Sequence, residues 1–362
     1  MRRAKVVSAG LFLLLLSSPL VAVRASEEGK GEPQGPAWEK VWSDKRADAT
    51  IRGLIGQVSS QRMREHLFHL SKDPLPFRKL NYTLPGHDKN TLYEADDFLT
   101  GKLQSWGYRV EREGVRVQAF RRDARKPKHA QYSRPLPEDP WYTAYNLYAE
   151  KRGRSRPEEI ILALAHKDSQ SWVDSPGAND NAIGTVGVLE MACVLAKHAP
   201  ERTVRFLWCN EEHTPWTSIT AARNARMRGD RIVAVFNMDG PGAPRQTKRG
   251  RKTNVSVYYA PEGERLADLV AAVNRHYRIG LAQRKHKVAG PGNDEGSFIK
   301  QGYRSAVHNI GTMPYADPNY HLPGDVPERV DVPTAAATTK ACLAATLWID
   351  RGWLLENPVP TS

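Results

Sequence analysis

The chain has 362 residues, of which 40% are apolar and 26% are charged, and its formal net charge is +13. This length and apolar content allow a large buried core and exclude a fibrous or wholly disordered protein. Its three cysteines show no CxxC spacing, so we expect neither a disulfide framework nor a thiolate metal site. The basic residues are scattered rather than gathered into a stripe with aromatic neighbours, so we expect no nucleic acid among the partners.

Residues 1–25 are typical of a signal peptide. A basic start is followed by an apolar stretch at residues 6–23, and we expect cleavage after Ala25. An uncleaved membrane anchor is disfavoured because residues 17–19 shorten the apolar run. No other segment is apolar enough to span a bilayer. We therefore expect an exported protein, periplasmic or extracellular, without stable membrane insertion after cleavage.

The next part of the chain predicts a lead-in followed by two helices. Residues 26–45 are rich in Glu, Gly, Lys and Pro, which is typical of a flexible segment. Apolar residues at helical spacing between Ile51 and Val58 predict the first helix. The second should begin at Thr91, with Glu94 completing a capping box, and should stop before Gly107.

From residue 108 onward, strands and helices alternate. The predicted strands occupy residues 108–120, 141–150, 160–165, 203–209, 232–236, 255–259 and 305–310. The predicted helices occupy residues 182–197, 218–228, 262–277 and 334–348. Three of the strands are continuously apolar, which indicates burial on both faces and parallel βαβ units. We expect an α/β fold with a mixed, mostly parallel central sheet and helices on both faces. Since no linker interrupts residues 46–355, we expect a single domain there.

Polar side chains follow each of the three apolar strands. They are His166, Lys167 and Asp168 after the first, Asn210, Glu211 and Glu212 after the second, and Asn237 and Asp239 after the third. Taken singly, each has an ordinary explanation, such as a surface histidine, a solvated pair of glutamates or a turn-forming aspartate. Ligands of open parallel sheets, however, bind beyond the carboxyl ends of the strands. The joint pattern therefore predicts a functional site at this edge.

At these positions the chain resembles the M28 family of zinc aminopeptidases. The matching segments are residues 165–169, 176–184, 210–212 and 237–239, and Tyr320-His321 with Asp325. The resemblance covers residues 140–340 well and residues 46–140 loosely. It implies a zinc-exopeptidase-like three-layer sandwich. It also implies a secreted metallo-exopeptidase, an aminopeptidase that removes N-terminal residues from peptide substrates.

The resemblance also implies two zinc ions as cofactors. His166 and Asp239 would be ligands of one ion, and Glu212 and His321 would be ligands of the other. Asp180 would bridge the two. Imidazole and carboxylate groups are ligands that suit zinc.

The resemblance implies catalytic roles for three further residues. Glu211 resembles the general base of the family, and Asp168 would orient the ring of His166. Tyr320 matches a position whose hydroxyl can donate a hydrogen bond to the developing oxyanion.

The substrate pocket is where the sequence departs from the family pattern. Asn293-Asp294-Glu295 stands where many relatives have Ser-Asp-His, so Glu295 replaces a histidine that lines the pocket. Asp294, Trp172 and Trp216 are further pocket candidates, although packing within loops would explain the two tryptophans equally well.

Other activities compatible with the same fold remain alternatives. One is a glutaminyl-peptide cyclotransferase, which works with one zinc ion, and another is a non-catalytic peptide-binding relative. Carboxypeptidase activity is typical of larger relatives whose extra domains this chain is too short to hold. We expect a monomer or a weak oligomer.

Overall fold

The computed structural model describes residues 44–126, 133–242, 252–313 and 317–353. They belong to one compact unit that begins at Asp44. The predicted signal peptide and nearly all of the predicted lead-in lie outside the described residues. Within the described part of the chain, no helix is both long enough and apolar enough to cross a membrane.

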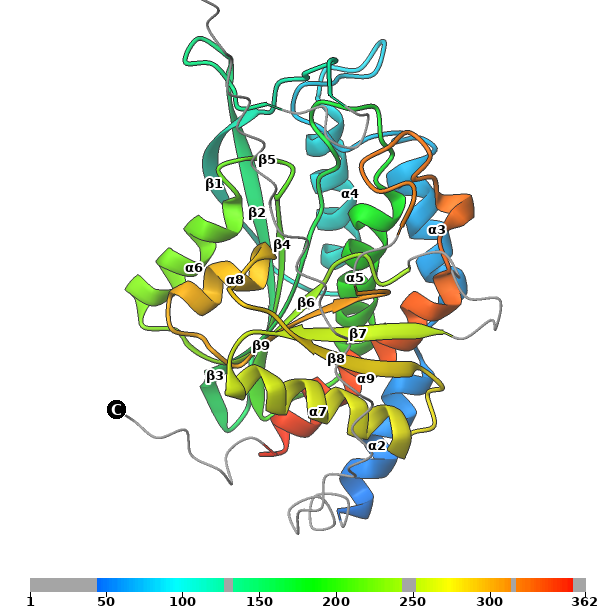
Figure 1. Cartoon of the computed structure of the whole chain (residues 1–362). Helices are drawn as coiled ribbons and strands as arrows, with labels where there is room; N and C mark the ends of the chain where they lie inside the picture. Colours follow the sequence, from blue (N-terminus) through cyan, green and yellow to red (C-terminus); the bar gives the residue numbers. More distant parts are fainter. Residues whose placement is uncertain (1–43, 127–132, 243–251, 314–316, 354–362) are drawn as a thin grey trace, which may run out of the picture. The chain divides into compact units, whose positions relative to one another are not determined.

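A single mixed sheet runs through this unit (Figure 1). The described strands lie in the order β5-β1-β2-β4-β3-β6-β9-β7-β8. Their bounds are β1 Val110–Ala119, β2 Trp141–Lys151, β3 Arg156–His166, β4 Arg202–Cys209, β5 His213–Thr214, β6 Arg231–Met238, β7 Thr253–Tyr258, β8 Ala282–Lys287 and β9 Ala306–Ile310. The four central strands β4, β3, β6 and β9 are parallel, whereas β2 and β7 join them antiparallel. The expected mixed α/β fold is confirmed, with its parallel part concentrated at the centre.

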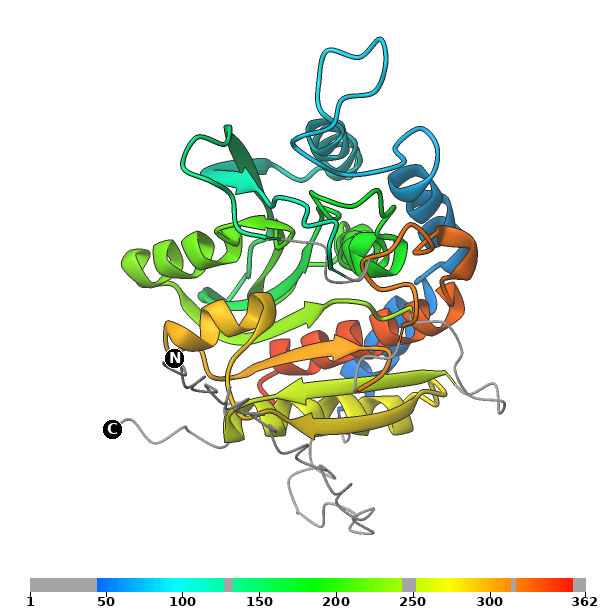
Figure 2. The ribbon, with the colours of Figure 1, turned by 45° about the horizontal axis from the view of Figure 1, so that its top comes forward.

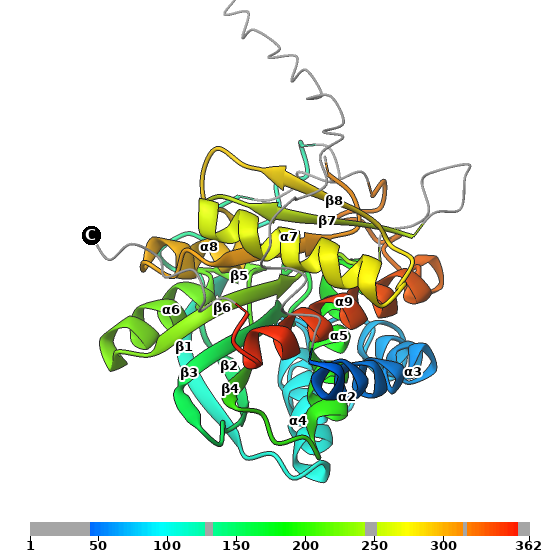
Figure 3. The same ribbon diagram turned by 90° about the horizontal axis from the view of Figure 1, so that it is seen from below.

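Helices cover both faces of this sheet (Figures 2 and 3). The first layer contains α2 Lys45–Gly56, α3 Ser60–Ser71, α4 Thr91–Ser105, α5 Ile183–Leu195, α7 Pro261–His276 and α9 Val332–Asp350, and the second contains α6 Thr217–Arg228 and α8 Asn293–Lys300. Helices α5 and α9 are buried along almost their whole length, because the sheet covers one side of them and α2, α3 and α7 cover the other. This makes α5 a rigid support for the loop that precedes it.

The N-terminus of α4 differs from the prediction in its cap. The helix begins at Thr91 as expected, but the side chain of Asn90 caps it by accepting a hydrogen bond from the Tyr93 backbone N–H at 2.9 Å. Glu94 approaches His87 at 2.5 Å and does not close a capping box with Thr91. The predicted box was wrong, because a better cap residue stands one position earlier.

Apart from the shortest elements, three of the described helices and strands carry no clear periodic signal and were not predicted. Helix α3 combines few apolar residues with many polar ones, and α8 is short and contains Gly296. Strand β8 lies at the edge of the sheet and is almost entirely polar, so it lacks the apolar run of the central strands. Two of these elements, β8 and α8, prove to lie beside the functional site.

Candidate metal centre

The five predicted metal ligands lie together at the carboxyl edge of the central strands. His166 is the last residue of β3, Glu212 follows β4 and Asp239 follows β6. Asp180 lies in η2 (Ala178–Ala182), the short turn directly before α5, and His321 lies in the loop between β9 and α9. The parallel order β4-β3-β6 therefore places the first three side chains next to one another.

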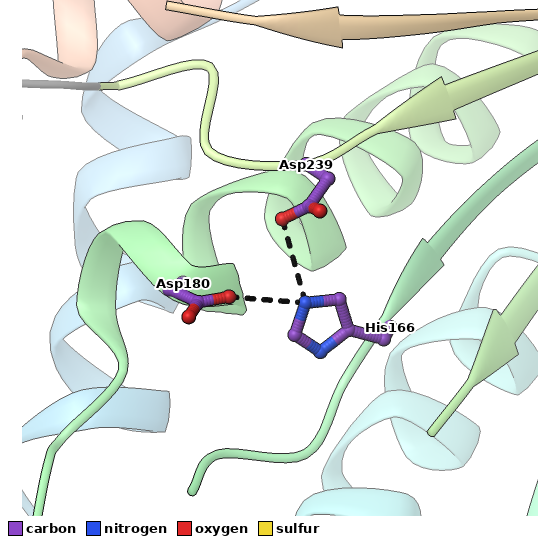
Figure 4. Close-up of side chains that lie close together, drawn as sticks. All are labelled: His166, Asp180 and Asp239. Carbon is purple, nitrogen blue, oxygen red and sulfur yellow. Dashed lines mark ion pairs between the residues drawn. The ribbon is translucent and has the colours of Figure 1, made fainter. Parts of the chain in front are cut away.

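The first group of ligand atoms consists of His166, Asp180 and Asp239. The Nε2 atom of His166 lies 3.2 Å from Oδ1 of Asp180 and 3.4 Å from Oδ1 of Asp239. Figure 4 shows both carboxylates directed at the same ring nitrogen. Three such atoms around one point can hold a metal ion.

The second group shares Asp180 with the first. Nε2 of His321 lies 2.9 Å from Oδ2 of Asp180 and 3.3 Å from Oε1 of Glu212. In each group the three ligand atoms lie within 4.8 Å of one another. One carboxylate thus offers an oxygen to each group, which is the arrangement expected for two neighbouring cations.

The polar atoms between these groups indicate that cations belong there. Asp180 Oδ2 and His321 Nε2 are buried and lie 2.9 Å apart, yet neither forms a hydrogen bond of regular geometry with any described residue. Burial disfavours the protonated imidazole of His321, but Glu212 and Asp180 raise its pKa to about 10. Buried polar atoms left unpaired are costly, so the residues fit a metal pair well. Imidazole nitrogen and carboxylate oxygen are the donors that zinc accepts.

Asp168 contacts three parts of the site and fixes their positions relative to one another. Its carboxylate accepts hydrogen bonds from the backbone N–H groups of Glu211 and Glu212, each at 2.9 Å. It also lies 2.8 Å from Nδ1 of His213 and 3.3 Å from Nδ1 of His166. Burial opposes its ionisation, yet the two histidines hold the pKa of Asp168 well below its ordinary value. Asp168 therefore acts as a negatively charged anchor behind the ligands.

The turn that carries Asp180 is fixed by a second buried carboxylate. Asp325 accepts hydrogen bonds from the backbone N–H groups of Asn179 at 2.8 Å and Asp180 at 3.0 Å. The side chain of Asn181 donates to the Met238 carbonyl at 2.9 Å, which ties the same turn to the end of β6. The ligands Asp180 and Asp239 are thereby held by one network.

Arg78, which the sequence did not single out, supports the site from behind. Its fully buried guanidinium donates hydrogen bonds to four backbone carbonyls, those of Leu70, Lys167, Pro176 and Gly177, at 2.5–2.7 Å. Burial lowers the pKa of Arg78 to about 10, which leaves it charged at neutral pH. A buried arginine with polar neighbours has no sequence signature, because its carbonyl partners come from any residue type.

Gly177, which precedes the Asp180 turn, has a positive φ of 58°. A Cβ at this position would lie 2.4 Å from the carbonyl oxygen of Asp180. The turn therefore requires glycine for both conformation and space.

Glu211 occupies a distinct position beside the ligands. Its Oε2 atom is buried and has no hydrogen-bond partner among the residues that the structure describes. Burial, together with the negative charge of Asp294, raises the pKa of Glu211 well above its ordinary value. A carboxylate in this condition is suited to accept and hold a proton.

A pocket of about 270 Å³ opens next to the metal centre. Its walls are formed by Asp180, Asp239, Val257, Val288, Gly290, Gly292, Asn293, Glu295, His308, Ile310, Met313 and Tyr320. Of the four pocket residues proposed from the sequence, Glu295 lies on this wall, and the other three do not. The apolar wall was not predicted from the sequence, because β7 follows β6 along the chain but is separated from it in the sheet by β9, which comes later in the sequence.

The remaining candidates lie elsewhere around the site. Trp172 is buried and packs edge-on against His321, with ring centroids 5.8 Å apart. Trp216 is half-buried at the N-cap of α6, and Asp294 is fully buried in the first turn of α8. Tyr320 stacks on His321 with ring centroids 3.7 Å apart and contributes to the pocket wall.

The fold and the site together define the class of protein: an α/β sandwich with a candidate two-metal centre at the carboxyl edge of its sheet. The model of peptidase family M28 matches residues 146–346, which is more than half of the chain. The chain belongs to peptidase family M28, as the sequence motifs predicted.

One similar protein matches a short part of the chain. An aminopeptidase of Pseudomonas aeruginosa is 37% identical over 102 residues, which cover 28% of this chain and 18% of that protein. The match thus spans less than a fifth of that relative's length.

Solved structures share the fold over a greater length. The Legionella pneumophila LapA aminopeptidase matches with a TM-score of 0.63 and 16% identity, over 83% of this chain and 75% of that one. A glutaminyl cyclase of Bacteroides thetaiotaomicron matches with a TM-score of 0.61 and 17% identity, over 80% of this chain and 97% of that one. At such identities the similarity shows the fold alone.

Proposed function

We propose that this protein is an exported zinc aminopeptidase that removes N-terminal residues from peptides. The observation that carries the proposal is the pair of three-ligand groups sharing Asp180, with Glu211 beside them and a pocket at their edge. Membership of peptidase family M28 and the aminopeptidases among the similar proteins support it.

Two zinc ions would be held by His166, Asp180 and Asp239 on one side and by Asp180, Glu212 and His321 on the other. When bound, such ions supply Lewis acidity for the scissile carbonyl and lower the pKa of water at the site.

The chain's own residues supply the proton transfers and the positioning. Glu211 takes a proton from the attacking water and passes it to the leaving amine, a role that contributes roughly 10²–10⁴-fold in rate. Its raised pKa suits it to hold that proton between the two steps. Tyr320, on the pocket wall, donates its hydroxyl hydrogen to the carbonyl oxygen as negative charge develops there. Asp168 keeps the backbone of Glu211 in place throughout.

A glutaminyl cyclotransferase is the second candidate, because a cyclase shares the fold. The complete group of His166, Asp180 and Asp239 favours two metals and hence the aminopeptidase, since cyclases of this fold are expected to use one.

Export is part of the proposal and rests on residues 1–25. Expression with the complete N-terminus, followed by N-terminal sequencing of the mature protein, tests it. We expect a mature chain that begins at Ser26, and an unprocessed chain retained in the cytoplasm would contradict export.

The activity is tested with a panel of aminoacyl-p-nitroanilides, assayed with zinc-loaded protein and again after chelation. We expect hydrolysis that is lost with the chelator and restored by zinc, and about two zinc ions per chain by elemental analysis. A peptide with N-terminal Gln distinguishes the cyclase, because it would lose ammonia and keep all its residues. If the zinc-loaded protein cleaves no member of the panel, the aminopeptidase proposal fails.

A further inference from the structure

The pocket beside the metal centre combines an apolar wall with one acidic side chain. Val257 and Ile310 belong to a buried apolar cluster against which Val288 and Met313 pack, and all four line the pocket. Beyond the metal ligands Asp180 and Asp239, Glu295 is the single carboxylate among the described lining residues. The pocket therefore offers methylene contacts along its wall and one negative charge.

Glu295 has no cationic partner among the described residues. The residue is 6% exposed, and its Oε2 atom accepts a hydrogen bond from the amide of Asn237 at 2.8 Å. No lysine or arginine lies among the described residues of the pocket wall, and Glu295 forms no ion pair with any described residue. A buried carboxylate with a neutral partner only is energetically costly, unless a bound ligand supplies the positive charge.

His308, which lines the same pocket, directs its ring nitrogens at groups other than Glu295. Its Nδ1 atom lies 2.8 Å from the side-chain amide nitrogen of Asn293, so Nδ1 accepts a hydrogen bond. Its Nε2 atom lies 3.2 Å from the backbone carbonyl of Asp239, to which it donates. Both ring nitrogens therefore have partners other than Glu295 among the described residues.

We propose that this pocket selects substrates whose N-terminal residue is lysine or arginine, with Glu295 pairing with the cationic end of that side chain. The inference rests on the proposed aminopeptidase function, which makes this pocket the place where the N-terminal side chain of the substrate binds. The methylene groups of such a side chain lie along Val257, Val288 and Ile310, and its charged end meets the carboxylate. The α-ammonium of the substrate is the other cation that could meet Glu295, and the experiment separates the two.

The ionisation of Glu295 agrees with a missing cation. Burial raises the pKa of Glu295 to about 7, and His308 and the hydrogen bond from Asn237 offset this only in part. A lysine or arginine side chain beside it would favour the ionised form and lower that pKa.

The first test compares Lys- and norleucine-p-nitroanilide, which differ at the charged end of the side chain. In the wild-type protein kcat/KM should be higher for lysine. Glu295→Gln keeps the acceptor for Asn237 but removes the charge, so it should lower kcat/KM for lysine by roughly 10- to 100-fold, as expected for a hydrogen bond to a charged group. The value for norleucine should stay within a few-fold.

A matched control corrects for the change in net charge. Glu65 lies exposed on α3, and the described structure gives it no ion pair, so Glu65→Gln should leave both substrates unchanged. An equal loss for lysine and norleucine in Glu295→Gln would mean that Glu295 meets the α-ammonium or supports the fold, and would overturn the inference. Equal kcat/KM for the two substrates in the wild-type protein would overturn it as well.

The second test needs no turnover and so separates this inference from the proposed activity. Calorimetric titration of zinc-loaded protein with free L-lysine and free L-norleucine measures the pocket directly. We expect lysine to bind at least about tenfold more tightly, and Glu295→Gln to abolish the difference. If lysine shows this Glu295-dependent preference in a protein that cleaves no substrate, the pocket inference stands and the aminopeptidase proposal falls. If lysine binds no better than norleucine, the inference itself is wrong.

Discussion

The metal centre and the pocket beside it are built from different kinds of element. The metal ligands come from the ends of three parallel central strands, from the turn before α5 and, for His321, from the loop between β9 and α9. The apolar and acidic pocket wall comes from β7, the segment after β8, the start of α8 and the end of β9. At the metal centre, Asp168, Asp325 and Arg78 hold the ligand-bearing backbone through buried hydrogen bonds. In the pocket, Glu295 lies buried with one neutral partner.

This difference matches the two functions that we assign to the regions, metal binding and substrate selection. A metal site needs ligands fixed to within a fraction of an ångström, and dense hydrogen bonding behind the ligands provides that. A substrate pocket needs polar groups that gain their ion-pair or hydrogen-bond partner only when the substrate binds. If the protein itself supplied that partner, the pocket would no longer distinguish one substrate side chain from another. Four variants test this contrast, from the largest expected effect to the smallest.

Glu211→Gln should have the largest effect on turnover. It removes the group that transfers the proton but leaves both ligand groups intact, so kcat should fall by roughly 10²–10⁴-fold. Zinc content by elemental analysis should remain that of the wild type. Loss of zinc from this variant would instead assign Glu211 to the ligands.

Asp180→Asn should weaken metal binding itself, because both ligand groups contain Asp180. We expect zinc affinity, measured by competition with a chelator, to fall by more than roughly 10-fold, the lower end of what loss of a supporting residue costs. Asp88→Asn, at an exposed position with no ion pair among the described residues, is the control and should bind zinc normally. Normal zinc content in Asp180→Asn would rule out the shared role.

Arg78→Met should reduce both stability and metal binding. It leaves several buried carbonyls without a donor, at ~1–3 kcal/mol each before relaxation, so the free energy of unfolding in urea should fall by about 3 kcal/mol. Zinc affinity should fall by about tenfold, because the carbonyls of Lys167 and Gly177 lose the hydrogen bonds that fix the backbone near the ligands.

Arg202→Met is a matched control for this variant. Arg202 is also buried, and it donates to the carbonyls of Ile349 and Asp350 at the far end of the sheet, at the start of β4. It also pairs with the buried carboxylate of Glu159, so Arg202→Met should lose at least as much stability while its folded fraction binds zinc as the wild type does. Equal zinc affinity in the two variants would show that Arg78 supports the fold without positioning the ligands.

Val257→Ala should have the smallest effect. It shortens the apolar wall without touching charge, so kcat/KM should fall by roughly 3- to 10-fold for lysine and norleucine substrates alike. Val255→Ala, in the same cluster but not on the pocket wall, should reduce stability and leave kcat/KM unchanged. Opposite effects on the two substrates would show that the wall and Glu295 do not act separately.

The amino-acid sequence determined the central strands and the gathering of the ligands. Apolar runs alternating with helices imply parallel βαβ units, and parallel strands present their carboxyl ends on one edge, so His166, Glu212 and Asp239 had to lie near one another. The motif resemblance added Asp180 and His321, which the structure places with the other three.

Only the tertiary structure decided the surroundings of these residues. It showed that Arg78 clamps the loops, that Trp172 packs on His321 and lies off the pocket wall, and that Glu295 is buried beside an apolar wall. The physical reason is that strand order follows from local periodicity and connection rules. Which side chains from distant segments touch one another depends instead on how the layers pack, and no local pattern encodes that.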